Sequence, residues 1–189
     1  MYDIVTKWDW GNSGDPNVYL DAQTRIQSVT FRVNLARLMD ALIKENKMDK
    51  ARDVIEISIK NIPIENFGYY TLVEPFIEGC YKVGETQKAR VFFESLKKKY
   101  QERLEYYASV GLDEQYGHID DIIGDMKAYR RNLDTFIAND TEDAAEKETL
   151  IFNEYIDKFR HFFRDSDNKE LPEGQFEIDP DSIDTLPEF

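Results

Sequence analysis

The sequence predicts an all-α fold in which three helical hairpins follow one another along the chain. Three observations lead to this prediction. Apolar residues recur at three- and four-residue steps from residue 21 onward, which is typical of amphipathic helices. No segment reads convincingly as a strand. A set of apolar positions also returns after 38 residues, which indicates a repeated structural unit.

The chain divides into a lead-in at residues 1–20, a helical body at residues 21–164 and an acidic tail at residues 165–189. Glycine and proline residues in the lead-in predict turns there. The aromatic residues of the lead-in are expected to pack onto the first helix rather than bind a ligand; they are Trp8, Trp10 and Tyr19.

The first hairpin is expected at about residues 21–62. Its first helix begins at Asp21 and ends near Asn46. Its second helix begins at Asp49 and has to end before Pro63, because proline disfavours helical geometry in the residue ahead of it.

The second hairpin is expected at about residues 68–107. Its first helix runs through Val73 and ends at Gly84, and Pro75 marks either the start of this helix or a kink in it. Its second helix continues to about Tyr107.

The third hairpin is expected at about residues 113–164, after a break at Gly111. Asp140 or Thr141 caps its second helix, which carries apolar residues as far as Phe163.

The tail carries more than half of the net negative charge. Nine acidic residues and one lysine give residues 165–189 a net charge of −8, out of −14 for the whole chain. Because the tail also has three prolines and no helical periodicity, we expect it to be extended and poorly ordered. Its apolar residues could still dock it along the body; they are Phe176, Ile178, Ile183 and Leu186.

The 38-residue repeat aligns the first hairpin with the second. Asn46 matches Gly84 in the turn, and Ala51 matches Ala89 near the start of the second helix. This turn and its small residue resemble a tetratricopeptide repeat, in which the small residue lets two helices cross closely. The resemblance implies a right-handed array of three hairpins, although the usual period is about 34 residues and the usual aromatic of the first helix is absent. A generic helical array is the alternative.

Composition argues against several classes of function. The chain has 38 acidic and 24 basic residues, which argues against nucleic acid or an anionic membrane surface as a partner, because both need clustered cations. No apolar run reaches the roughly 18 residues of a membrane-spanning helix. The single cysteine, Cys80, falls at a core position, so we expect a buried and inert thiol.

No motif for catalysis, a cofactor or a metal ion stands out, so we expect none of the three. The two histidines, His118 and His161, lie on different helices and lack the spacing of zinc ligands. We expect an ordinary surface role for His161. Asp120, Asp121 and Asp125 are expected to form a solvated helix face rather than a catalytic carboxylate pair.

The best candidate for a functional surface is a groove for a protein or peptide. In a superhelix of helical hairpins, the first helix of each pair lines the concave face. The residues that the repeat register places on this face are Asp40, Ile43, Lys44, Glu74, Glu78, Tyr81 and Lys82. Tyr81 is the favoured binding hot spot, because tyrosine offers a large contact area at low entropic cost. The alternative is that the lead-in or the tail fills this groove.

Several short sequence segments in residues 1–164, taken together and in order, resemble those of a known protein family. They are Trp10-Gly11-Asn12, Tyr19-Leu20-Asp21, the Leu38 to Ala51 hairpin, Leu72 to Gly84, and Leu104-Glu105-Tyr106-Tyr107. In this order they resemble the soluble C-terminal region of a bacterial family of large multi-pass membrane proteins. The membrane part of that family resembles protein O-mannosyltransferases, of the glycosyltransferase-C class. The resemblance implies that the catalytic carboxylates belong to the membrane part, and that this region lies in the cell envelope, outside the cytoplasmic membrane.

The sequence therefore predicts a non-catalytic protein-interaction domain that is accessory to a membrane glycosyltransferase-like protein. Its expected partner is a protein or peptide, one option being the membrane domain of the same protein. The alternative is a free-standing cytoplasmic adaptor or chaperone-like protein of the tetratricopeptide type. An enzyme is a third interpretation, which no constellation of residues supports.

Overall fold

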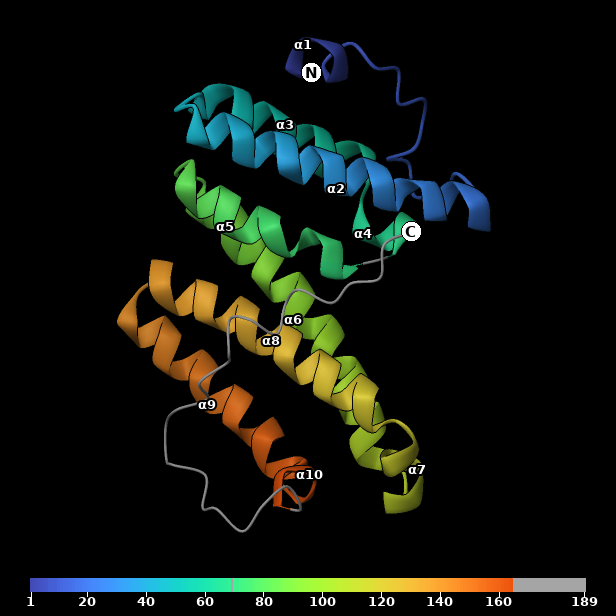
Figure 1. Cartoon of the computed structure of the whole chain (residues 1–189), viewed down its shortest axis with the longest axis vertical. Helices are drawn as coiled ribbons and strands as arrows, with labels where there is room; N and C mark the ends of the chain where they lie inside the picture. Colours follow the sequence, from blue (N-terminus) through green and yellow to red (C-terminus); the bar gives the residue numbers. More distant parts are fainter. Residues whose placement is uncertain (69, 165–189) are drawn as a thin grey trace.

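The computed structural model describes residues 1–68 and 70–164, and all regular structure in this part of the chain is helical, as predicted. Three hairpins are stacked along the long axis of the molecule (Figure 1). The hairpins are α2 (Ala22–Lys44) with α3 (Met48–Asn61), α5 (Glu74–Lys82) with α6 (Thr86–Ser109), and α8 (Ile119–Asn139) with α9 (Glu142–Lys158). The shorter helical segments are α1 (Tyr2–Val5), α4 (Ile64–Phe67), the 3-10 helix η1 (Tyr70–Val73), α7 (Leu112–Gly117) and α10 (His161–Arg164). The predicted tail, residues 165–189, lies outside the described residues.

The local signals in the sequence set the ends of the helices. Asp21 caps α2, because its side chain accepts a hydrogen bond from the backbone N–H of Thr24 at 2.8 Å. Pro75 lies in the first turn of α5, so it marks the start of this helix and not a kink. Thr141 is the residue that precedes α9, while Gly111 precedes the short helix α7.

The turns of the first two hairpins share one backbone geometry. Asn46 and Gly84 both adopt the left-handed conformation, with φ of 59° and 80°. In each turn the following residue donates its backbone N–H to a carbonyl five residues earlier, at 2.8 Å, which closes the helix. The matched residues Ala51 and Ala89 are both fully buried. At these positions the sequence repeat is therefore also a repeat of conformation and burial.

The third hairpin ends differently from the prediction. The last helix was expected to continue to Phe163, but α9 ends at Lys158 and α10 begins at His161. The turn between them lets Phe159 and Phe162 both reach the core, where their rings stack with centroids 6.1 Å apart. Burial of these two rings explains the break.

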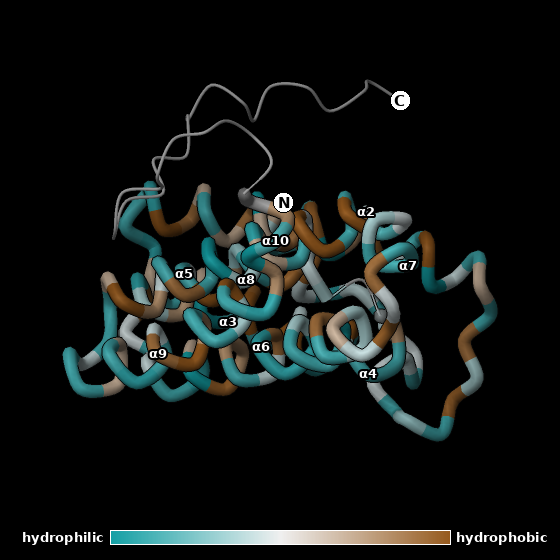
Figure 2. The backbone as a smooth tube through the Cα atoms, turned by 90° about the horizontal axis from the view of Figure 1, so that it is seen from below, coloured by the Kyte–Doolittle hydropathy of each residue, from teal (hydrophilic) through white to brown (hydrophobic). Residues whose placement is uncertain are grey.

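The core runs through all three hairpins. Phe93 of α6 stacks on Phe136 of α8 with ring centroids 4.4 Å apart, and Tyr129 of α8 packs edge-on against Phe152 of α9 at 5.0 Å. Figure 2 shows hydrophobic positions recurring between hydrophilic ones along the helices, as expected when one face is buried. The most extensive helix–helix contacts join members of one hairpin or of adjacent hairpins.

A buried arginine holds the segment that follows the first hairpin. The Arg32 guanidinium donates hydrogen bonds to the carbonyl oxygens of Gly68 at 2.7 Å and Ile62 at 2.9 Å. Burial lowers the pKa of Arg32 to about 10, so the side chain stays charged at neutral pH. These bonds fix the α4 segment against α2, and so set where the second hairpin begins.

Candidate functional site

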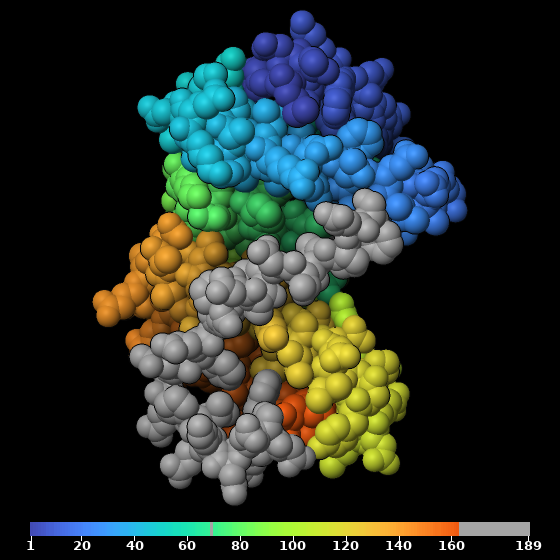
Figure 3. Space-filling model, in the orientation of Figure 1, coloured from blue at the N-terminus to red at the C-terminus, as the bar shows by residue number. Residues whose placement is uncertain are grey.

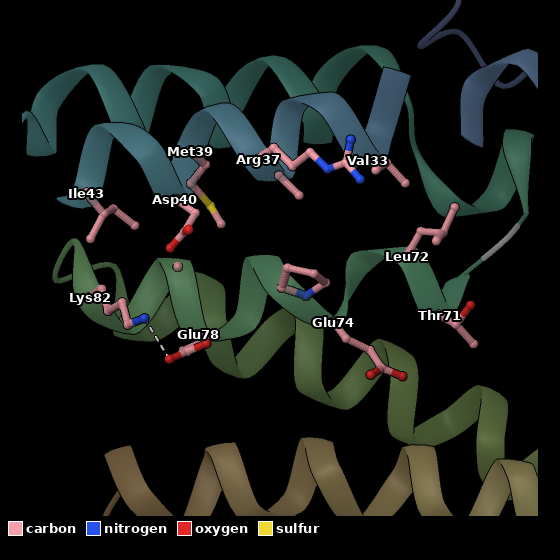
Figure 4. A pocket seen from close by; sticks show the side chains of 13 residues that line it. Val33, Arg37, Met39, Asp40, Ile43, Thr71, Leu72, Glu74, Glu78 and Lys82 are labelled. Carbon is pink, nitrogen blue, oxygen red and sulfur yellow. Dashed lines mark ion pairs between the residues drawn. The ribbon is translucent and has the colours of Figure 1, made fainter. Parts of the chain in front are cut away.

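An open groove of about 420 Å³ lies between α2 and α5, with η1 at one end (Figure 4). Figure 3 shows the same side of the molecule in space-filling form, with the first hairpin in blue above α5 in green. Apolar atoms form the floor of the groove, and charged side chains stand along its rim. The residues of the floor are Val33, Ala36, Met39, Ile43, Leu72, Pro75 and Gly79.

A glycine sets the depth of this groove. A Cβ atom at Gly79 of α5 would lie only 2.3 Å from Met39 Sδ of α2. Because Gly79 has no side chain, Met39 can fill the space between the two helices, and it is 3% exposed. The close approach of α2 and α5 at this point thus depends on one small residue.

Two acidic side chains on the rim, Asp40 and Glu78, are each paired with a lysine. Lys44 Nζ lies 2.7 Å from Asp40 Oδ2, and Lys82 Nζ lies 2.7 Å from Glu78 Oε1. Each pair joins residues four apart on one helix. Within the described part of the chain, Arg37 has no ion-pair or hydrogen-bond partner. The rim therefore offers one exposed guanidinium to a ligand.

Glu74 connects the groove to the rest of the core. Its Oε1 accepts a hydrogen bond from the Tyr100 hydroxyl at 2.6 Å, and its Oε2 lies 3.2 Å from Arg131 Nη2 of α8. Burial, followed by the bond to Glu74, raises the pKa of Tyr100, so this phenol remains a donor at physiological pH. One carboxylate at the start of α5 thus joins the second hairpin to the third at this end of the groove.

The structure brings five of the seven predicted groove residues together along the groove. They are Asp40, Ile43, Glu74, Glu78 and Lys82. Lys44 is 75% exposed and lies beyond the lining, where it pairs with Asp40.

Tyr81 does not line the groove, which corrects its predicted placement on the groove face. It follows Gly79 by two residues, or about 200° around the helix, so it points away from α2. Its hydroxyl donates to Asp140 Oδ2 at 2.9 Å, and Arg90 donates to the same carboxylate from Nε at 2.8 Å and from Nη2 at 2.7 Å. Tyr81 therefore joins α5 to the turn between α8 and α9.

These contacts shift the pKa values of both Asp140 and Tyr81. The hydrogen bond from Arg90, more than any other contact, lowers the pKa of Asp140 to about 2. Burial, and then the bond to Asp140, raises the pKa of Tyr81. Both groups keep one charge state across the physiological range, so the cluster acts as a fixed structural link.

Sequence reasoning missed several groove residues. Val33 and Arg37 lie at three- and four-residue steps ahead of Asp40, so extending the helical stripe backward would have found them. Thr71 and Leu72 belong to η1, whose position depends on how the preceding segment folds onto α2. No local pattern in the sequence gives that position.

The lead-in does not fill the groove, because none of its residues lines it. Instead it packs on the first hairpin: Trp8 and Trp10 contact Phe31 of α2 with ring centroids 5.7 Å and 6.0 Å away. The expectation that the lead-in aromatics pack onto the first helix is confirmed for these two residues. It is wrong for Tyr19, which is 85% exposed.

Asp125 corrects another expectation. Asp120 and Asp121 are exposed as predicted, but Asp125 is 6% exposed, because it lies three residues after the buried Ile122 on the face of α8 that packs against α6. Arg103 Nε lies 3.0 Å from its Oδ2. Burial outweighs this positive charge and raises the pKa of Asp125 to about 6.

Outside the two acidic clusters described above, the cysteine and the histidines of the described residues lie apart from one another. Cys80 is fully buried as predicted, and burial raises its pKa to about 12. His161 packs against Phe162, with ring centroids 4.1 Å apart. Across residues 1–68 and 70–164, no group of three or more histidine, cysteine or acidic residues is placed to hold a metal ion. In the same residues, no helix has the length and apolar character needed to cross a membrane.

Comparison with known proteins found no match among protein-family models, curated proteins or solved structures.

Proposed function

We propose that this chain is a non-catalytic protein-interaction domain that binds an extended segment of a protein in the groove between α2 and α5. The observation that carries the proposal is the groove itself. It is open along its length, apolar on its floor and charged on its rim. Grooves of this kind hold peptides by burying apolar side chains while polar groups at the edge fix register.

The charges on the rim define the ligand more closely. Asp40 and Glu78 already have lysine partners, so they offer little to a cationic peptide. Arg37 has no such partner among the described residues and stands beside the apolar floor. A guanidinium binds a carboxylate through two parallel hydrogen bonds. We therefore propose a segment that carries an apolar side chain and, next to it, an aspartate, a glutamate or a C-terminal carboxylate.

We also propose that the three hairpins form a right-handed, tetratricopeptide-like array. The matched turns at Asn46 and Gly84 support this, as do the matched buried alanines at Ala51 and Ala89. Contacts of α2 with α5, and of α5 with α8, place the first helices of successive hairpins side by side. In such an array the groove would lie on the concave face.

The proposed setting is the cell envelope, as an accessory domain of a membrane glycosyltransferase-like protein. This part of the proposal rests on the resemblance of the sequence segments in residues 1–164. The ligand segment would then belong to the membrane domain or to another envelope protein. A free-standing cytoplasmic adaptor is the alternative, and the groove would serve it equally well.

A peptide-display library tests the proposed ligand. Selection on the purified chain should enrich peptides that combine an apolar residue with a nearby carboxylate. Arg37→Glu should weaken binding of an enriched peptide about tenfold or more, because it replaces a charge-assisted pair with repulsion. Isothermal titration calorimetry measures this change.

Arg25→Glu is the matched control, because it makes the same charge change on α2 outside the groove lining. It should leave the affinity within about twofold. The proposal fails if the two variants weaken binding equally, or if no peptide is enriched. Saturable binding of a nucleotide sugar would contradict the non-catalytic interpretation.

A further inference from the structure

The two tryptophans of the chain meet in a second hollow, on the side of the first hairpin that the lead-in covers. This hollow encloses about 370 Å³ between the lead-in, α2 and the end of α3. Trp8 and Trp10 lie 5.4 Å apart between ring centroids, and both contact Phe31. Trp8 remains 39% exposed and Phe31 40% exposed, so ring surface stays open to a ligand.

Hydrogen bonds of the lead-in hold this aromatic cluster in place. Ser13 Oγ donates to the carbonyl oxygen of Asn61 at 2.7 Å, and Asn66 Nδ2 donates to the carbonyl oxygen of Asp15 at 3.0 Å. Asp9 Oδ1 accepts from the Gly11 N–H at 2.8 Å, which closes a turn around Trp10. The lead-in is thus attached to the last residue of α3 and to α4 directly after the two tryptophans.

Polar groups at the hollow are available to a ligand. Asp9 has no cationic partner within residues 1–68 and 70–164, and only one of its carboxylate oxygens is used in the turn. The Gln27 amide also lines the hollow, with no hydrogen-bond partner in the same part of the chain. A carboxylate accepts hydrogen bonds, and an amide both donates and accepts them. The hydroxyl groups of a ligand could therefore donate hydrogen bonds to Asp9 and Gln27, or accept them from Gln27.

We propose that this hollow binds one neutral sugar ring, such as a hexopyranose unit of a glycan. The flat apolar face of a sugar ring stacks on exposed aromatic surface, and its hydroxyls would meet Asp9 and Gln27. The ring planes meet at angles of 59°, 77° and 72°, so the surface for stacking is one exposed ring face, that of Trp8 or of Phe31. The Asp9 carboxylate disfavours an anionic ligand. The Gln27 amide can hydrogen-bond to sugar hydroxyls but not to a quaternary ammonium group, so it favours a neutral polyhydroxyl ligand over such a cation.

Tryptophan fluorescence reports on this site directly, because Trp8 and Trp10 are the only tryptophans in the chain. Titration with the methyl glycosides of glucose, galactose, mannose and N-acetylglucosamine should give a saturable change for at least one, with half-saturation at about 1 mM. Trp8→Ala should weaken that binding about tenfold, and Gln27→Ala about threefold. Gln27 is exposed on α2, so its replacement preserves the fold.

The matched control for Trp8→Ala is Tyr19→Ala, which removes an exposed aromatic of the same segment from outside the hollow. It should leave the affinity unchanged. No saturable change with any of the four glycosides up to about 100 mM would overturn the proposal. It would equally fail if Gln27→Ala bound as tightly as the native chain, or if choline chloride saturated the signal and the glycosides did not.

Discussion

Four hydrogen-bond donors converge on the carboxylate of Asp140. They come from the Tyr81 hydroxyl, from two nitrogens of Arg90 and from the backbone N–H of Thr141. The Asp140 side chain is fully buried. A buried carboxylate is stable only when its oxygens are satisfied in this way, and Asp140 therefore links α5, α6 and the turn into α9.

The low pKa of Asp140 makes its contribution to stability depend on pH. Its pKa is about 2 in the folded chain and close to 3.9 when unfolded, so the stabilisation is complete above pH 4 and is lost as pH falls toward 2. Urea denaturation should show that Asp140→Asn lowers the free energy of unfolding at pH 6. That deficit should shrink by about 2 kcal/mol between pH 4 and pH 2. A deficit that stays constant over this range would show that the charge of Asp140 contributes nothing.

The contribution of Asp125 to the free energy of unfolding should depend on pH in the opposite direction. Its folded pKa of about 6 lies above the unfolded value, so the folded state holds the proton more tightly and loses stability as pH rises from 4 to 6. Asp125→Asn removes this titration. Relative to the variant, the native chain should lose roughly 1–3 kcal/mol between pH 4 and pH 6 and then level off. Denaturation curves at half-unit pH intervals measure this, with the exposed Asp120→Asn as a flat control.

At the scale of the structural elements, the two matched turns carry different residues at their left-handed position. Gly84 and Asn46 share a left-handed backbone, but only Gly84 lacks a Cβ. A Cβ at Gly84 would meet no atom within 4 Å, so Gly84→Ala tests backbone conformation alone. We expect it to cost about 1 kcal/mol. Gly124→Ala is the control within α8, where a Cβ also meets no atom within 4 Å, and it should stabilise by about 0.5–1 kcal/mol. Equal effects in thermal denaturation would contradict this account.

The longer helices could be predicted from the sequence, and the short connecting segments could not. Asp21 and Pro75 act locally, so capping and proline rules placed the starts of α2 and α5. The segment of α4 and η1 instead takes its position from Arg32, which is distant in sequence and bonds to the Ile62 and Gly68 carbonyls. A contact of this kind follows from tertiary packing and leaves no local pattern.

At the scale of the whole molecule, the repeat predicted the helices that form the groove but not every side chain in it. It placed Glu78 and Lys82 correctly, since both lie on the face of α5 that meets α2. Tyr81 was misplaced because the face of α5 turned toward α8 could not be known before the hairpins were stacked. The burial of Asp125 escaped prediction for the same reason.

Within the described residues, a continuous core extends from Val5 to Phe162. Deleting residues 168–189 should therefore change the melting temperature by no more than about 2 °C. Deleting residues 159–189 instead removes Phe159 and Phe162, and should lower it by 10 °C or so. Circular dichroism at 222 nm measures both. A large drop for the shorter deletion would show that the tail contributes to the core.

The stacking of the hairpins also has a mechanical consequence. The first described helix, α1, and the last, α10, lie at opposite ends of the stack, with the three hairpins in series between them (Figure 1). Because the extensive contacts join neighbours, tension applied between these ends would load the interfaces in series, and the weakest would separate first. The chain would then yield in steps, lengthening by one hairpin at a time, and whatever is attached at its ends would be joined by an extensible spacer.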